Sequence, residues 1–187
     1  MVAPHLDDPA RAALHRELAY LAEHMTALHD DLVEREHALT SLVIHASYGR
    51  SALLFVGDGL TGVLDFDRAA HDLLGFDLAY ALKAFARSGP VRRAGVGMDA
   101  DLCRAFLADY CAQAPLGGTD LDALPLMFRA QRLVKVVKKC DNIMAKAAQA
   151  TDAGRDAEKY AGIIAREGDR VRWLADRTED LATAVTS

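Results

Sequence analysis

Residues 42–82 read LVIHASYGRSALLFVGDGLTGVLDFDRAAHDLLGFDLAYAL, and this stretch decides the fold. Two short apolar runs, 53–56 and 60–65, flank the sequence GDG at 57–59, a pattern that is typical of a β-hairpin. Over residues 76–86 the apolar side chains recur at helical spacing instead. The stretch therefore predicts a small hairpin that is followed closely by a helix.

The sequence on either side of this stretch has a helical pattern. Residues 10–40 carry leucine or methionine alternately four and three positions apart, which is typical of a helix with one apolar seam. Residues 99–187 contain further amphipathic segments that are separated by short breaks. We therefore expect a mainly α protein with one small β-hairpin, built as a single domain over residues 1–187. The seam residues are Leu14, Leu18, Leu21, Met25, Leu28 and Leu32.

The composition is that of a globular chain of 187 residues, and its 51% hydrophobic content excludes an intrinsically disordered protein. No run reaches the roughly 18–20 apolar residues that a membrane span needs, and the first residues lack the apolar segment of a signal peptide. A net charge of −5 argues against a nucleic-acid or membrane surface as the main partner. Three cysteines without metal-type spacing fit a reducing compartment, so we expect a cytoplasmic protein.

The motifs within residues 42–82 resemble the catalytic core of the aminoglycoside phosphotransferase and homoserine kinase type II family, which has a protein-kinase-like fold. The family pattern VIHGDxxxxNxLF corresponds to VIHASYGRSALLF at 43–55, its VIDFD motif to VLDFD at 63–67, and its next helix start to DLAYAL at 77–82. The resemblance covers about residues 12–145 and implies the C-terminal lobe of that fold. Only 44 residues precede His45, so we expect the nucleotide-binding lobe to be absent.

Three of the catalytic-loop positions that the resemblance implies are altered. Ser47 stands where the family has its catalytic aspartate, and Ala46 replaces the preceding glycine. Ala52 stands where the family has a magnesium-binding asparagine, and a methyl group offers no oxygen to a hard cation. Asp65 is retained at the metal-binding position of the DFD motif. Losing a general base alone costs on the order of 10²–10⁴ in rate, so we expect no ATP-dependent phosphotransfer by this chain, no cofactor and no metal.

The remaining polar residues of this core supply the candidate site. Asp65 and Asp67 lie at the end of a predicted strand and are our candidates for acid/base catalysis. His45 and Asp77 occupy scaffold positions in the family, which implies that they brace the loop and cap or anchor the next helix. A nucleophilic triad of Ser47, His45 and Asp65 is a further alternative that the residue types allow. The expected substrate-binding residues are Ser47, Tyr48, Arg50, Arg132 and Lys135.

These residues indicate a protein that binds a small molecule and transforms it without ATP by acid/base chemistry, such as a cyclisation, an elimination or an isomerisation in bacterial secondary metabolism. One alternative is a non-catalytic, pseudokinase-like binding or regulatory module. Another is half of a split small-molecule phosphotransferase that a second chain completes. We also expect a homodimer or a partner chain to contact the seam of residues 10–40, where packing within the chain's own domain is the competing interpretation.

Overall fold

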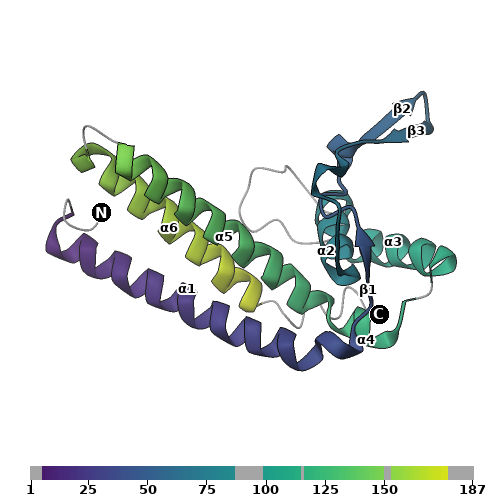
Figure 1. Ribbon diagram of the computed structural model, residues 1–187, viewed down its shortest axis with the longest axis horizontal. Coiled ribbons are helices and arrows are strands. Elements are labelled where there is room, and N and C mark those ends of the chain that lie inside the picture. The colour runs from purple at the N-terminus through teal and green to yellow at the C-terminus, as the bar shows by residue number, and fades with distance from the viewer. Residues whose placement is uncertain (1–5, 87–98, 115, 150–152, 177–187) are drawn as a thin grey trace.

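The computed structural model describes residues 6–86, 99–114, 116–149 and 153–176. Within these ranges the chain forms a bundle of long helices that continues into a smaller unit of short strands and helices (Figure 1). No described helix combines the length and the hydrophobicity needed to cross a bilayer. In chain order the elements are α1 (Asp8–Arg35), η2 (Glu36–Ala38), β1 (Ser41–Ile44), η3 (Arg50–Ala52), β2 (Leu53–Val56), β3 (Gly59–Val63), η4 (Phe66–Arg68), β4 (Ala70–Leu73), α2 (Leu74–Phe85), α3 (Ala100–Gln113), α4 (Gly118–Asp122), α5 (Leu124–Gln149) and α6 (Ala153–Ala175).

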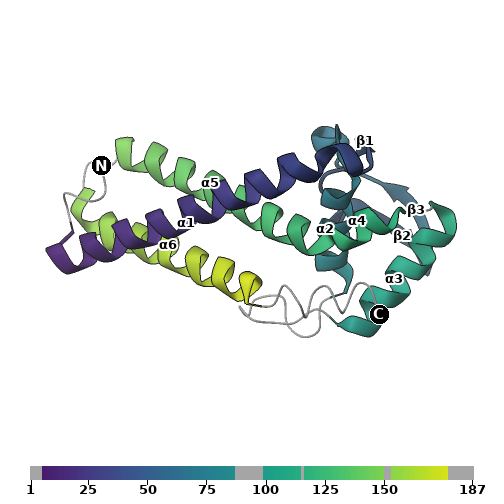
Figure 2. The same cartoon turned by 90° about the horizontal axis from the view of Figure 1, so that it is seen from below.

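The bundle consists of α1, α5 and α6, which pack against one another (Figure 1), and α1 crosses α5 at an angle in the second view (Figure 2). α1 begins where the Asp7 carboxylate accepts a hydrogen bond of 2.8 Å from the backbone N–H of Ala10. Its seam splits in two, because Leu14, Leu21 and Leu28 are buried against α5 and α6 whereas Leu18 and Met25 are 38% and 39% exposed. Leu32 also packs against both hydrophobic cores, so four of the six seam residues are used inside the chain, and a partner on this helix stays a prediction.

The predicted hairpin is confirmed. β2 and β3 pair antiparallel, and Gly57 occupies the turn with a φ of 57°, a conformation that glycine adopts without steric cost. The hairpin projects away from the rest of the molecule (Figure 1). The end of β2 next to the turn is apolar and exposed, with Phe55 at 57% and Val56 at 75% exposure. Few side chains therefore cover this hairpin.

A second two-stranded sheet, formed by β1 and β4, was not predicted from the sequence. Ser41 pairs with Leu73 and Ile44 pairs with Ala70 in antiparallel register. The pairing is non-local, and the β4 sequence AHDL has a weak strand pattern. This sheet closes the chain around the hairpin, so that the segment after β1 comes to lie beside the segment after β3.

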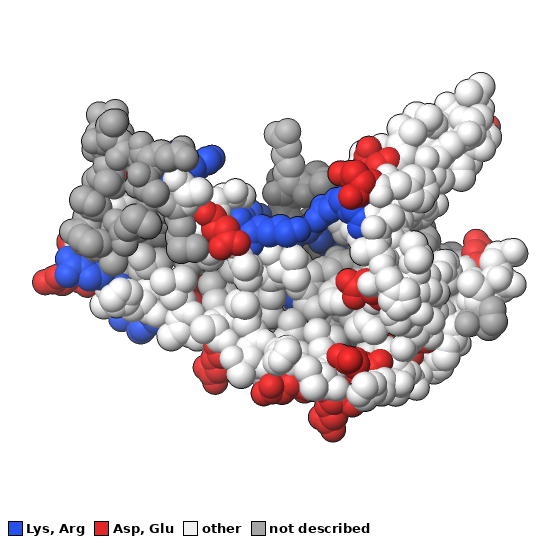
Figure 3. Space-filling model, in the orientation of Figure 1, with Lys and Arg blue, Asp and Glu red and all other residues white. Residues whose placement is uncertain are grey.

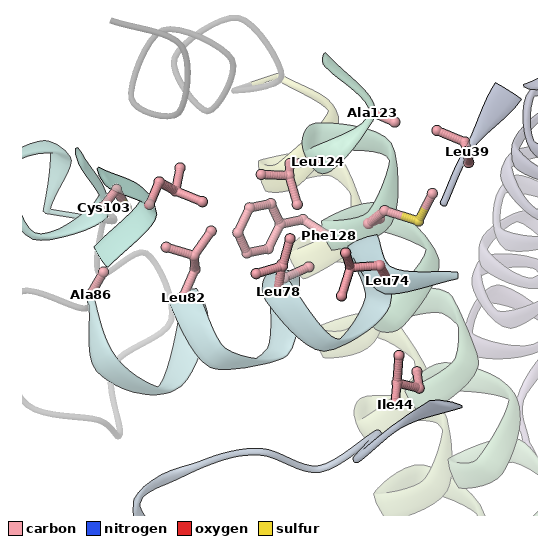
Figure 4. Close-up of a cluster of buried hydrophobic side chains, with 13 residues drawn as sticks. Leu39, Ile44, Leu74, Leu78, Leu82, Ala86, Cys103, Ala123, Leu124 and Phe128 are labelled. Atoms are coloured by element: carbon pink, nitrogen blue, oxygen red, sulfur yellow. The ribbon is translucent and has the colours of Figure 1, made fainter. Parts of the chain in front are cut away.

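A separate hydrophobic core joins α2 to α5 (Figure 4). Leu78 and Leu82 of α2 point toward Leu124 and Phe128 of α5, and all four are 5% exposed or less. Burial of this apolar surface holds the strands and α2 to the end of the bundle.

Polar anchors fix the ends of two further segments. Asp120 is buried, and its carboxylate accepts hydrogen bonds from the backbone N–H and the hydroxyl of Thr40, at 2.8 and 2.7 Å. Asp99 caps α3, accepting from the backbone N–H groups of Asp101 and Leu102 at 3.1 Å. These contacts fix where β1 starts and where α3 begins.

Candidate functional site

Two loops meet at the candidate site, one after β1 and one after β3. Each contains a residue with a left-handed backbone, Ala46 with a φ of 61° and Asp65 with a φ of 64°. For residues other than glycine this conformation costs on the order of 1–2 kcal/mol. The surrounding contacts must supply the energy that holds both loops in these shapes.

His45 is the centre of these contacts. Its Nε2 donates to the carbonyl of Leu64 at 2.7 Å, and its backbone N–H donates to the carboxylate of Asp77 at 3.0 Å. Because Nε2 carries the proton, Nδ1 of the neutral ring is an acceptor, and it receives the backbone N–H of Ser47 at 3.3 Å. The imidazole also contacts the ring of Phe66, with 4.7 Å between the centroids. His45 thus binds the first loop, the second loop and α2 together.

Ser47 lies at the junction of the two loops. Its hydroxyl is 3.2 Å from Nδ1 of His45 and 3.4 Å from the backbone carbonyl of Asp65. In a nucleophilic triad the other ring nitrogen of the histidine would donate to a carboxylate, but here it donates to the Leu64 carbonyl. The structure therefore does not assemble the triad of Ser47, His45 and Asp65.

Asp65 and Asp67 are both exposed and flank Phe66, the first residue of η4. Among the described residues neither carboxylate has a hydrogen bond or an ion pair. Acidic side chains gather at the foot of the projecting hairpin, next to a run of lysine and arginine (Figure 3). The two aspartates are accessible to a ligand, and no described residue forms an ion pair with either of them.

Asp77 lies against the backbone of the first loop, and α2 begins without a side-chain cap. The second carboxylate oxygen of Asp77 is buried and has no hydrogen-bond partner among the described residues. Asp77 and Tyr48 line one cavity of about 420 Å³, which we call the aromatic pocket, together with Phe106, Asp109 and Tyr110. Burial, followed by the nearby charge of Asp77, raises the pKa of Tyr110, so its phenol stays protonated.

Lys135 lines a different cavity, which we call the loop groove. This cavity of about 290 Å³ lies between the first loop and α5, and its cationic side chains are Arg68, Lys135 and Lys138. Ala46 forms part of its wall, and Asp72 is its one carboxylate. The ammonium group of Lys135 also sits 5.3 Å from the centre of the Tyr80 ring, a cation–π contact that orients it.

Arg132 and Arg50 lie outside both cavities. Arg132 is 17% exposed and forms an ion pair with Glu167 of α6. Burial and then the charge of Arg170 lower the pKa of Arg132 to about 10. Arg50 is exposed in η3 and lines neither cavity. The five predicted binding residues thus lie in five different places, and only Lys135 lines the loop groove.

Comparison with known proteins decides the family. The profile of the Phosphotransferase enzyme family matches residues 1–117. This chain belongs to the phosphotransferase enzyme family. A homoserine kinase of Rhodopseudomonas palustris (strain BisB18) is 32% identical over 162 residues, covering 82% of this chain and 44% of the relative. A homoserine kinase of Agrobacterium fabrum is 30% identical over 133 residues, covering 70% of this chain and 36% of the relative. The chain therefore spans less than half the length of these homoserine kinases.

The loop of this phosphotransferase-family chain does not fit a magnesium ion. Ala52, at the position of the family's asparagine, is 1% exposed and presents only a methyl group. Of the two family positions that bind magnesium, 52 and 65, only Asp65 therefore carries an oxygen donor. Among the described residues, no three His, Cys, Asp or Glu side chains are grouped so that they could hold a metal. The donor set falls short of the octahedral oxygen shell that magnesium demands.

Sequence reasoning missed several residues that line the cavities of this phosphotransferase-family chain. Arg68 and Lys138 lie in the loop groove with the predicted Lys135. Arg68 could have been predicted as a binding residue, because it directly follows the candidate catalytic residue Asp67 and its cation can bind an anionic ligand. Asp109 of the aromatic pocket had no local signal, since its proximity to Asp77 follows from the packing of α3 on α2.

Proposed function

We propose that this protein binds a small anionic molecule in the loop groove and does not transfer phosphate from ATP through its own loop. The observation that carries the proposal is the set of three cations, Arg68, Lys135 and Lys138, against the single carboxylate of Asp72. Clustered cations in a concave site attract and orient a carboxylate or phosphate group. The whole chain has a net charge of −5, so this local excess of positive charge does not follow from composition.

The absence of phosphotransfer is inferred from the loop itself. Phosphoryl transfer depends on positioning and on charge neutralisation by metal ions and fixed side chains. Ser47 already hydrogen-bonds to His45, and its hydroxyl is a far weaker base than a carboxylate. Ala52 is buried and supplies no metal ligand. The loop thus retains its shape without the groups that the transfer needs.

The relatives indicate the class of ligand to test first. They are named homoserine kinases, and homoserine is a small zwitterionic amino acid that offers the lysines one carboxylate. The phosphate ester of homoserine carries a second anionic group. Both molecules are small enough for a cavity of about 290 Å³. We therefore propose them as probes of the loop groove.

Acid/base chemistry on the bound molecule is a second candidate function, favoured by the backbone of Asp65. A left-handed aspartate is strained, and such strain gathers at functional sites. Asp67 directly precedes Arg68, which lines the groove. In this proposal Asp65 and Asp67 move protons on a ligand that Lys135 holds. A purely binding or regulatory module would retain the groove without needing either aspartate.

Binding is tested by calorimetry with homoserine and, separately, with its phosphate ester. We expect at least one of them to bind, and K135Q/K138Q to weaken it about tenfold or more, because each charge-assisted contact contributes about 1.5–3 kcal/mol. D65N/D67N should leave affinity close to wild type and abolish any turnover of the ligand. Failure of both molecules to bind, or equal affinity for K135Q/K138Q, contradicts the proposal.

A separate measurement addresses the split-phosphotransferase alternative. Thermal denaturation of the wild-type chain with ATP and magnesium should show no shift in midpoint. S47D/A52N, which restores the family's aspartate and asparagine, serves as the matched comparison. A clear shift for the wild-type chain, or ADP release in the presence of homoserine, would revive phosphotransfer.

A further inference from the structure

A second basic cavity lies between α5 and α6, outside the loop groove and the aromatic pocket. We call this cavity of about 370 Å³ the helix groove. Its charged lining residues are Lys139, Lys146, Lys159, Arg166, Arg170 and Glu167. Five cations therefore surround a single carboxylate.

The helical spacing explains why the cations gather there. Lys139 and Lys146 are seven residues apart on α5, and Lys159 and Arg166 are seven apart on α6. Seven residues make nearly two turns, so each pair occupies one face of its helix. The two helices pack against each other, and the two cationic faces thus line one cavity.

The positive charge of the helix groove is only partly compensated. Glu167 is 2% exposed, and it pairs with Lys139, with Arg170 at 2.8 Å and with Arg132 beneath the groove. Lys159 is 3.5 Å from Asp156. Lys146 and Arg166 form no ion pair with any described residue. Three cations thus share one carboxylate while two more have no counter-charge in the described part of the chain.

The cations around Lys139 affect its pKa. Burial lowers the pKa of Lys139, and the charges of Arg132, Arg170 and Arg166 lower it further. Like charges held this close repel one another, which an anion between them would relieve.

The chemistry of the lining selects the anion. Guanidinium and ammonium groups together match the oxygens of a phosphate better than a single carboxylate, because several charges and donors converge. Ile143, Tyr160 and Ile163 add apolar surface to the same cavity. We propose that the helix groove is a second ligand site, which binds a soluble molecule carrying a phosphate or pyrophosphate group.

Calorimetric titration of the full chain with inorganic pyrophosphate tests this site. We expect saturable binding, and K146Q/R166Q should weaken it by about tenfold or more, because it removes the two uncompensated cations. Both side chains are exposed, so the double variant should retain the fold. The matched control is K135Q/K138Q, which removes two cations of the loop groove and should leave the affinity of the helix groove for pyrophosphate within about threefold of wild type, even where it weakens a second pyrophosphate site in the loop groove.

The outcomes separate this site from the loop groove. No saturable binding of pyrophosphate, or equal weakening by the two double variants, overturns the assignment even if homoserine binds normally. A lipid source of the phosphate is tested by sedimentation with phosphatidylcholine vesicles that contain phosphatidylglycerol. Vesicle binding that K146Q/R166Q abolishes, without binding of pyrophosphate, would overturn the soluble ligand proposed here.

Discussion

Replacing Glu167 by glutamine tests how the charges between α5 and α6 are balanced. The carboxylate is 2% exposed and contacts Arg132, Lys139 and Arg170. When it is neutralised, Lys139 and Arg170 can turn toward water, because their side chains are 44% and 39% exposed. Each of those two ion pairs contributes less than about 1 kcal/mol to the free energy of unfolding. Arg132 has no such route, since only 17% of its side chain is exposed.

The main cost of E167Q is therefore one buried guanidinium without a counter-charge. Breaking a buried pair in this way costs about 3 kcal/mol. We expect urea denaturation at pH 7 to show a loss of that size. Adding R132M should recover most of it, because a methionine removes the stranded charge and fills similar space.

The test compares the free energies of unfolding of E167Q and E167Q/R132M. A loss below about 1 kcal/mol for E167Q would show that water reaches this pair and that Arg132 is not confined. A double variant no more stable than the single one would refute the assignment of the cost to Arg132. E167Q should also tighten pyrophosphate binding in the helix groove, since it removes the one carboxylate there.

Three further predictions follow from single features. A46G should raise stability by about 1 kcal/mol in thermal denaturation, because glycine relieves the left-handed φ of 61°; an unchanged or lower midpoint contradicts the strain. Burial and then the charge of Asp99 raise the pKa of Cys103 to about 11, so iodoacetamide at pH 8 should label it only after unfolding, and its contribution to stability should fall as pH rises from about 9 to 11; rapid native labelling argues against this burial. If α1 mediates self-association, light scattering should show more than a 20.2 kDa monomer, and L18E/M25E should reduce it to one; a wild-type monomer removes that prediction.

Local sequence signals predicted much of the fold. The GDG turn and the apolar runs beside it identified the hairpin, and the amphipathic pattern that starts at residue 99 matches the start of α3 at Ala100. The short breaks expected between the helices after residue 99 are present as well, for example where α4 ends at Asp122 just before α5 starts at Leu124. These signals succeed because turns and caps depend on a few neighbouring residues.

Non-local pairing explains what sequence reasoning missed. β1 and β4 are joined by the whole intervening hairpin, and neither is marked by a strong alternating pattern. Arg132 and Lys135 were both expected to bind the substrate, and their separation was missed for a related reason. Lys135 lies about 60° around the helix from Arg132, and only the position of α6 determines that Arg132 meets Glu167 while Lys135 faces the loop groove.

The contacts of the loop explain how its shape can persist without the groups of phosphotransfer. His45 bonds the carbonyl of Leu64, and Asp77 accepts from the backbone N–H of His45. These partners are backbone groups, so they remain whatever side chains the neighbouring positions carry. Ser47 and Ala52 occupy the positions whose family role is directed at a substrate or a metal. The scaffold contacts thus hold Ala46 in the wall of the loop groove independently of any catalytic group. A binding function can rest on the scaffold alone, which is why the lysines of the groove, and not Ser47, are the residues on which the proposed function depends.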